Sequence, residues 1–298
     1  MRRISDHTLT IIIRQQHLVS KVVLRRFTNP HGELLDINVQ TGRTRRLHPS
    51  ASMYEIDYIS AAPNEAERLW ATVEERMPRA YASIDNNTIL QDPVALQTLK
   101  DCIALHFIRS YMLKRVTQVS TAGAIAQMRG QLTNEGQAQV LEEFLRQTGI
   151  QLAGPEGLAF AVERILATIK PALSSAQEFW ERVKVHFQDV RRWCAGLALE
   201  IISPQHVDDE FLIGDTPALS YKAGNFLGGP LTGVPLSEAA AVYMPIGPRH
   251  LVSLAKQGGQ FVMDRSQVGL VNHMQVLNAQ RHACARLGSG LIVRSVVS

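Results

Sequence analysis

The chain has 298 residues, of which 45% are hydrophobic and 19% are charged, and its formal net charge is +4. These proportions are ordinary for a folded globular protein and exclude a chain that is disordered throughout. The apolar runs are shorter than the ~20 residues of a membrane-spanning helix, and the N-terminal apolar stretch lacks a signal-peptide cleavage site. We therefore expect a cytoplasmic protein without a membrane partner.

The positive charge is concentrated near the N-terminus. The first 50 residues hold nine arginines and lysines against three acidic residues, a surplus of six in one sixth of the chain. A basic region of this kind favours an anionic partner such as RNA, DNA or a nucleotide. The alternative is a solvated face that only aids solubility.

Residues 8–48 are predicted to be β-rich. Residues 9–13 have the composition of a strand, and residues 34–39 and 43–47 flank a tight turn. Gly42 suits this turn because glycine readily adopts a positive φ. The expected structure is a hairpin.

Residues 64–202 are predicted to be helical, because their apolar residues recur with a period near 3.6. Pro78 should bend or break the first helix, and Pro93 suits the first turn of the next one. Ser174 or Ser175 can cap the longest helix. The expected helices cover residues 66–83, 93–118, 141–148 (ending at Gly149), 158–169 (ending before Pro171) and 175–202.

Residues 208–298 return to short strands around one more helix. The predicted strands are 211–213, 242–244, 250–254 and 291–293, and the amphipathic helix is 266–286. Strands and helices do not alternate, which indicates an α+β fold rather than a doubly wound or barrel fold. We expect one domain over residues 1–298, with a helix-rich central bundle and a small, mainly antiparallel sheet. That sheet should join N- and C-terminal strands, whose edges need pairing.

The three cysteines are far apart and sit in apolar helical patterns. They are Cys102, Cys194 and Cys284, and no two of them have the spacing of metal ligands. We expect all three to be buried. The sequence predicts no metal site and identifies no cofactor.

Several short motifs follow one another in a characteristic order. They are His17 with Leu24-Arg25-Arg26-Phe27, Tyr54-Glu55-Ile56-Asp57-Tyr58, the glutamates Glu67, Glu74 and Glu75, Phe107-Ile108-Arg109, Phe211 to Asp215-Thr216-Pro217, and Asn272-His273 to Asn278 and Arg281. Together they resemble the bacterial DUF4238 family, over residues 17–293 with gaps. Ser20 stands where that family usually has a proline. The resemblance implies a shared fold and leaves the function to be argued from the residues.

Three polar residues are the candidate catalytic groups. Asp215 ends an apolar strand between Gly214 and Pro217, and it suits a general base, a metal ligand or an arginine partner. Arg109 lies on a mostly apolar helix, where it would bind Asp215 or a phosphate. His17 suits acid–base work near neutral pH.

Each of these residues also has a purely structural interpretation. Asp215 would bond neighbouring backbone nitrogens, Arg109 would tie the core together, and His17 would be a satisfied structural residue. Arg25, Arg26 and Asn272 are the candidate substrate-binding residues. The two arginines would hold a phosphate close to His17.

Two functional hypotheses follow. The first is a hydrolase acting on RNA or another phosphodiester or nucleotide, in a bacterial toxin or defence role. The second is a non-catalytic binding or sensor module that recognises an anionic partner. Catalysis requires His17, Arg109 and Asp215 to share an open cleft, whereas a binding module leaves them buried and mutually satisfied.

Overall fold

The computed structural model describes residues 13–130, 132–173, 175–222 and 234–289. The predicted strands over 9–13 and 291–293 therefore lie largely or wholly outside the described residues. The chain forms two compact units, of which the first joins residues 1–111 to 184–298 and the second comprises residues 112–183. The fold is α+β, as predicted, and its sheets are mainly antiparallel.

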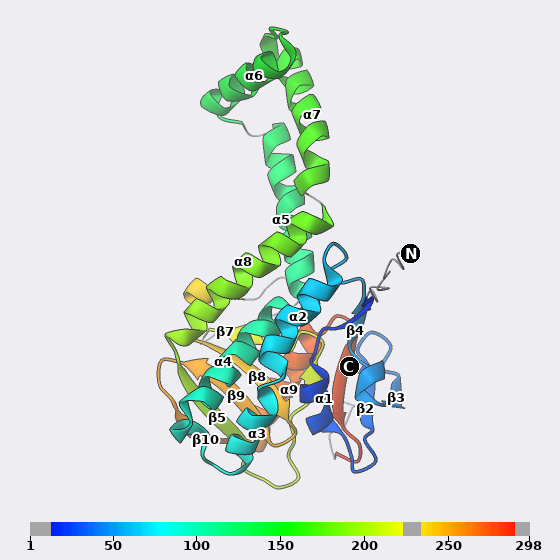
Figure 1. Ribbon diagram of the computed structural model, residues 1–298, viewed down its shortest axis with the longest axis vertical. Coiled ribbons are helices and arrows are strands. Elements are labelled where there is room, and N and C mark those ends of the chain that lie inside the picture. The colour runs from blue at the N-terminus through cyan, green and yellow to red at the C-terminus, as the bar shows by residue number, and fades with distance from the viewer. Residues whose placement is uncertain (1–12, 131, 174, 223–233, 290–298) are drawn as a thin grey trace, which may run out of the picture. The chain divides into compact units, whose positions relative to one another are not determined.

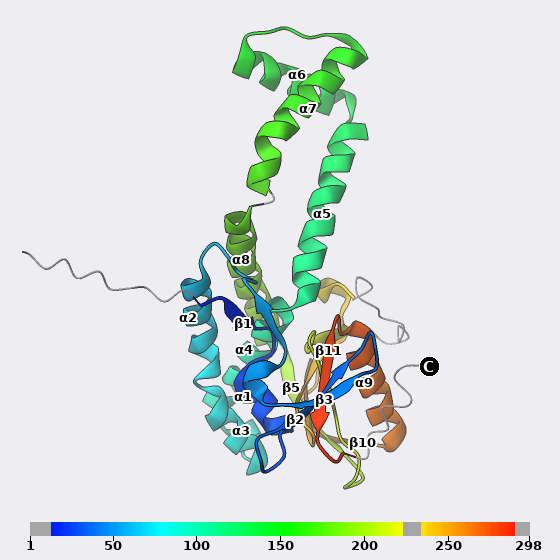
Figure 2. The same cartoon turned by 90° about the vertical axis from the view of Figure 1, so that its right-hand side faces the viewer.

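A four-stranded sheet joins the two ends of the sequence within the first unit (Figure 2). Its strands, in spatial order, are β3 (Thr44–Leu47), β2 (Leu34–Asn38), β11 (His282–Arg286) and β6 (Ile213–Gly214). All neighbouring pairs are antiparallel. The predicted hairpin is β2–β3, and Gly42 has a φ of 67° in its turn. The expectation that N- and C-terminal strands pair with each other is confirmed.

A five-stranded sheet is the second layer of this unit. Its order is β10 (Gly259–Met263), β5 (Ala198–Pro204), β9 (His250–Ala255), β8 (Ala241–Gly247) and β7 (Leu219–Tyr221). Only the β10–β5 pair among them is parallel. A separate two-stranded ribbon pairs β1 (Gln15–His17) with β4 (Tyr54–Ile56).

Four helices of the first unit come from the N-terminal half of the chain (Figure 1). They are α1 (Lys21–Leu24), α2 (Pro63–Glu74), α3 (Met77–Asp85) and α4 (Pro93–Ile108). Pro78 lies in the first turn of α3, so the predicted break falls just before it. The Asp92 side chain caps α4 by accepting bonds from two backbone nitrogens.

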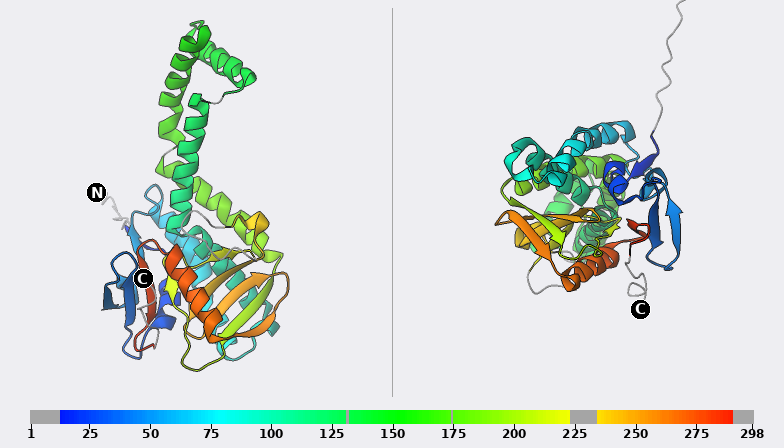
Figure 3. Two further views of the ribbon diagram at one scale, coloured as in Figure 1. Left: turned by 180° about the vertical axis from the view of Figure 1, so that it is seen from behind. Right: turned by 90° about the horizontal axis from the view of Figure 1, so that it is seen from below.

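Helix α9 (Arg265–Asn278) lies against the five-stranded sheet on the face opposite to α4 (Figure 3). Its first half packs on that sheet, where Val268 and Val271 join a core cluster with Leu251. Its second half packs on the four-stranded sheet, where Val276 joins Ile37. One helix therefore covers parts of both sheets.

The second unit is helical. It contains most of α5 (Tyr111–Gly130), α6 (Asn134–Thr148), α7 (Gly154–Leu173) and the first turns of α8 (Ala176–Ala195). Gly149 ends α6 with a φ of 72°, as the sequence predicted. The Ser175 hydroxyl accepts a hydrogen bond from the Glu178 backbone nitrogen (3.0 Å) and caps α8.

Several predicted helix boundaries were wrong, among them the following four. The helix over 93–118 is broken at Arg109 and Ser110 between α4 and α5, and α7 continues through Pro171 near its end. The helix over 175–202 ends at Ala195, and Ala198–Pro204, which includes the β-branched Ile201 and Ile202, forms β5. The helix over 266–286 ends at Asn278, and its last part is strand β11.

Candidate functional site

Arg109 forms the centre of a buried polar cluster at the end of α4. Its guanidinium lies 2.7 Å from a carboxylate oxygen of Glu74 on α2 and 2.6 Å from the Ser20 hydroxyl, to which it donates. It also donates to the Leu18 carbonyl at 3.3 Å and lies over the Trp70 ring. The partner of Arg109 is therefore Glu74, and the pair with Asp215 that the sequence suggested does not form.

Ser20 and His106 complete this cluster. The Ser20 hydroxyl donates to Glu74 (2.6 Å), and the Ser20 backbone nitrogen donates to His106 Nε2 (3.1 Å). Because Nε2 accepts, Nδ1 carries the proton and donates to the Cys102 carbonyl at 2.8 Å. A proline at position 20 would have no backbone N–H to donate to His106. Ser20, which stands where the family usually has a proline, therefore makes a hydrogen bond that a proline could not make.

The charges in the Arg109 cluster (Arg109, Glu74, Ser20 and His106) are set by burial and by the guanidinium. Burial disfavours the carboxylate form of Glu74, but Arg109 and the Ser20 hydroxyl outweigh it and lower its pKa. Burial and Arg109 lower the pKa of His106 to about 3. Arg109 and Glu74 are thus a charged pair, and His106 is neutral.

His17 ends β1 beside this cluster and is 9% exposed. Burial, with smaller contributions from Lys21 and Arg109, lowers its pKa to about 4, so the ring is neutral near pH 7. Its Nε2 atom has no hydrogen-bond partner within the part of the chain that the structure describes.

Asp215 is fully buried just after β6. Its carboxylate accepts hydrogen bonds from the backbone nitrogens of Gln280 (2.7 Å), Arg281 (2.8 Å) and His282 (3.0 Å). Burial raises its pKa, and the three donors oppose that shift. The side chain bonds backbone nitrogens, as its structural interpretation required, but those nitrogens lie about 65 residues further along the chain and join α9 to β11.

Only two of the three candidate catalytic residues share a neighbourhood. His17 and Arg109 influence each other electrostatically. Among the described residues, Asp215 forms no hydrogen bond or ion pair with either of them. The expected convergence of all three on one cleft is therefore not seen in their contacts.

Asn272 and Gln275 of α9 bind the backbone of residues 210–217. Asn272 accepts from the Leu212 nitrogen (2.9 Å) and donates to the Glu210 carbonyl (2.8 Å), so both ends of its amide are occupied. Gln275 makes the equivalent pair of bonds with Gly214 and Pro217. These amides attach α9 to the four-stranded sheet.

Arg25 and Arg26 differ in their surroundings. Arg26 binds both carboxylate oxygens of Asp85 (2.9 and 2.7 Å) and lies over the Tyr81 ring. Arg25 is exposed, as are Arg43 and Arg46 near the edge strand β3. These three arginines form no ion pair with any described residue, so their charge is available to a partner.

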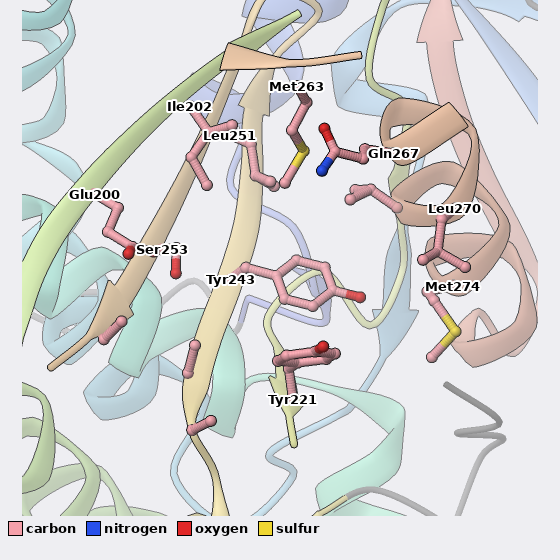
Figure 4. A pocket seen from close by; sticks show the side chains of 14 residues that line it. Glu200, Ile202, Tyr221, Tyr243, Leu251, Ser253, Met263, Gln267, Leu270 and Met274 are labelled. Carbon is pink, nitrogen blue, oxygen red and sulfur yellow. The ribbon is translucent and has the colours of Figure 1, made fainter. Parts of the chain in front are cut away.

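A cavity of about 570 Å³ lies between the five-stranded sheet and α9 (Figure 4). Glu200, Ser253 and Tyr243 form a row across β5, β9 and β8, because Ser253 is the register partner of the other two. Their side chains share the face that α9 only partly covers. The remaining walls are mainly apolar and include Ile202, Leu251, Met263, Leu270, Val271 and Met274.

The polar groups of this sheet cavity (the hollow lined by Glu200, Tyr221, Tyr243, Ser253 and the apolar residues above) differ from those of the Arg109 cluster. Among the described residues, the Glu200 carboxylate and the Ser253 and Tyr243 hydroxyls have no hydrogen-bond or ion-pair partner. Burial raises the pKa of Tyr243 well above its ordinary value, so its hydroxyl stays protonated and can donate. A mainly apolar hollow with a few unpartnered polar groups is the usual form of a ligand site.

The prediction from sequence missed this cavity. The sequence predicts a helix at Glu200. It predicts Tyr243 and Ser253 correctly in strands, but it does not indicate them or Tyr221 as site residues. The available indication was the alternation of Leu199, Glu200 and Ile201, which is typical of a strand with two different faces.

Within the described residues, no three histidine, cysteine, aspartate or glutamate side chains are arranged to hold a metal ion. No described helix combines the length and the apolar composition needed to cross a bilayer. The three cysteines are free and buried, as predicted.

Comparison with known proteins identifies the family. No curated protein and no solved structure matches the chain. The family model described as "Protein of unknown function (DUF4238)" matches residues 15–287, which is most of the chain. This protein therefore belongs to the DUF4238 family.

Proposed function

We propose that this protein is a non-catalytic binding or sensor module whose ligand site is the sheet cavity. The observation that carries the proposal is the contrast in polar contacts. The candidate catalytic residues Arg109 and Asp215 are buried and bonded to other groups of the protein. Glu200, Ser253 and Tyr243 instead face a hollow and have no hydrogen-bond or ion-pair partner among the described residues. A polar group that is left unpaired in an apolar site costs free energy, which a ligand can recover.

A cavity-filling substitution tests this function. Ala255 lines the cavity, and Ala255→Phe would occupy part of its volume. The exposed Val262→Phe on β10 is the matched control, since it adds an aromatic ring to the same sheet at a position that does not line the cavity. We expect an uncharged apolar dye, N-phenylnaphthylamine, to fluoresce on binding the unmodified protein and the control.

The expected result for Ala255→Phe is at least a tenfold weaker affinity for the dye at unchanged thermal stability. Equal binding by both variants, or no binding by the unmodified protein, would refute the proposed site. A loss of binding that accompanies unfolding of Ala255→Phe would be resolved with the smaller change Ala255→Val.

An anionic partner, and nucleic acid in particular, is a second candidate. The observation that favours it is that Arg25, Arg43 and Arg46 are exposed and form no ion pair within the described part of the chain. Arginine side chains bind phosphate oxygens well, and such binding weakens steeply as salt rises. We expect the double variant Arg43→Gln/Arg46→Gln to bind RNA more weakly and with a smaller salt dependence than Arg129→Gln/Arg146→Gln, which removes the same charge from ion-paired arginines.

A protein that binds an anionic partner could also cleave it. The corresponding candidate is a hydrolase acting on RNA or another phosphodiester or nucleotide, in a toxin or defence role. The unpartnered Nε2 of His17 favours it, since a neutral imidazole can accept a proton. The test is incubation of the protein with total RNA, with and without Mg²⁺, beside His17→Ala. Cleavage that depends on His17 would support the hydrolase, and no cleavage, or equal cleavage by both proteins, would remove His17 from any such reaction.

A further inference from the structure

We propose that the sheet cavity selects an aromatic or similarly apolar small molecule that carries one protonated nitrogen, with this nitrogen held at Glu200. The inference rests on the proposed binding function and specifies its ligand class. Three features of the lining support it: the single carboxylate, the pair of tyrosine rings and the two methionines.

The charge of the lining favours a cation. Among the described residues that line the cavity, Glu200 is the only acidic one, and none is lysine, arginine or histidine. Its carboxylate has no ion-pair partner among the described residues. In a partly desolvated site such a charge attracts a cationic ligand and repels an anionic one.

Ser253 is placed to direct the nitrogen. It is the register partner of Glu200, and Figure 4 shows the two side-chain oxygens next to each other on the strand side of the cavity. An ammonium group has several N–H donors, so it can donate to the carboxylate and to the hydroxyl together. A hydrogen bond of this kind to an ionised acceptor is stronger than a bond between neutral groups.

The aromatic part of the ligand fits beside the two tyrosines. Figure 4 shows the Tyr221 and Tyr243 rings one next to the other, on the side of the cavity toward Leu270 and Met274. Ring faces attract both aromatic rings and cations, and methionine sulfur makes favourable contacts with aromatic edges. The volume of about 570 Å³ lies in the usual range for small-molecule sites.

Three probes with one ring system and different charges test this inference. They are naphthylmethylamine (cation), naphthylmethanol (neutral) and naphthoate (anion), each titrated into the intact protein by calorimetry at neutral pH. We expect the amine to bind about tenfold more tightly than the alcohol, and the carboxylate to bind most weakly. Glu200→Gln should remove the advantage of the amine and leave the affinity for the alcohol unchanged.

The matched control is Glu142→Gln, which removes one negative charge from an exposed position on α6. Its probe affinities should equal those of the unmodified protein. Equal binding of amine and alcohol, tighter binding of the carboxylate, or no effect of Glu200→Gln would overturn the selection for a cation and leave the binding function standing. If no probe binds the unmodified protein, or Ala255→Phe binds all probes normally, the proposed function itself fails.

Discussion

The Arg109 cluster and the sheet cavity both place polar side chains among apolar residues, but only in the cluster do these side chains bond one another. Arg109, Glu74, Ser20 and His106 satisfy one another, and they come from segments that lie far apart in the sequence. In the cavity, Glu200, Ser253 and Tyr243 point at empty volume. A buried polar residue therefore indicates a ligand site only when the protein leaves it without partners.

The largest expected effect is on stability at the Arg109 cluster. Arg109→Met leaves the Glu74 carboxylate buried without its counter-ion, and we expect a loss of ~3–5 kcal/mol in the free energy of unfolding. Urea denaturation followed by circular dichroism measures it. The double variant Arg109→Met/Glu74→Gln should recover part of the loss, and additive effects of the two changes would show that the pair is not coupled.

A second stability effect is expected at Asp215. Asp215→Asn replaces a carboxylate that accepts three backbone hydrogen bonds by an amide whose NH₂ group cannot accept, at a cost of ~2–3 kcal/mol. Hydrogen exchange should become faster at the amides of residues 280–282 in particular. Uniformly faster exchange across the whole unit would contradict the role of Asp215 in holding this loop.

The pH dependence at His17 should be smaller. Its pKa falls from 6.5 in the unfolded chain to about 4 in the folded protein, so between these values only the unfolded chain takes up the proton. The contribution of the neutral ring to stability is complete above pH 6.5 and is lost as the pH falls toward 4. His106 acts in the same direction over a wider range, from pH 6.5 down to about 3, because burial and Arg109 lower its pKa from 6.5 to about 3.

Replacing the His17 imidazole should therefore remove only part of the loss of stability at acid pH, because His106 remains. We expect the melting temperature of His17→Asn to fall less steeply between pH 6.5 and 4 than that of the unmodified protein. His31→Asn, at an exposed histidine, serves as control and should leave the slope unchanged. A slope that is identical in all three proteins would mean that the folded protein takes up a proton at His17 as readily as the unfolded chain does.

The smallest stability effects should occur in the cavity. Glu200→Gln and Tyr243→Phe break no hydrogen bond or ion pair within the described residues, so the free energy of unfolding should change by less than ~0.5 kcal/mol. Denaturation beside Arg109→Met measures the difference directly. A loss of several kcal/mol at either position would show that these side chains stabilise the fold as those of the Arg109 cluster do, and would contradict the difference between the two regions.

The sequence predicts local structure well at proline and glycine, which restrict or widen the backbone conformations available. Pro78, Pro93, Gly149 and Gly42 lie at a helix start, a helix end or a turn, as expected. Pairing between N- and C-terminal strands could also be predicted, because the edge of a strand needs a hydrogen-bonding partner. The polarity of the interior was also visible, because Arg109 and Asp215 stand out in apolar surroundings.

The partners of those residues were not predictable. Arg109 pairs with Glu74 rather than with Asp215. Either pairing would place a carboxylate beside the guanidinium, so the sequence alone cannot distinguish the two partners. The cavity was missed because residues 198–202 suit a helix as well as a strand when they are taken alone. In the folded protein these residues pair with β9 and β10, which makes them a strand and brings Glu200 onto the same face as Tyr243.

Gly214 determines how closely α9 approaches the sheet beneath it. A Cβ atom at this position would come within 2.6 Å of the Gln275 carbonyl oxygen, so backbone lies directly on backbone there. A methyl group at position 214 would act as a wedge under the C-terminal half of α9 and lift the helix. The same helix also covers the sheet cavity through Leu270 and Met274. Gly214 lies in the other sheet, and because it has no side chain it sets the distance between α9 and the strands that line this cavity.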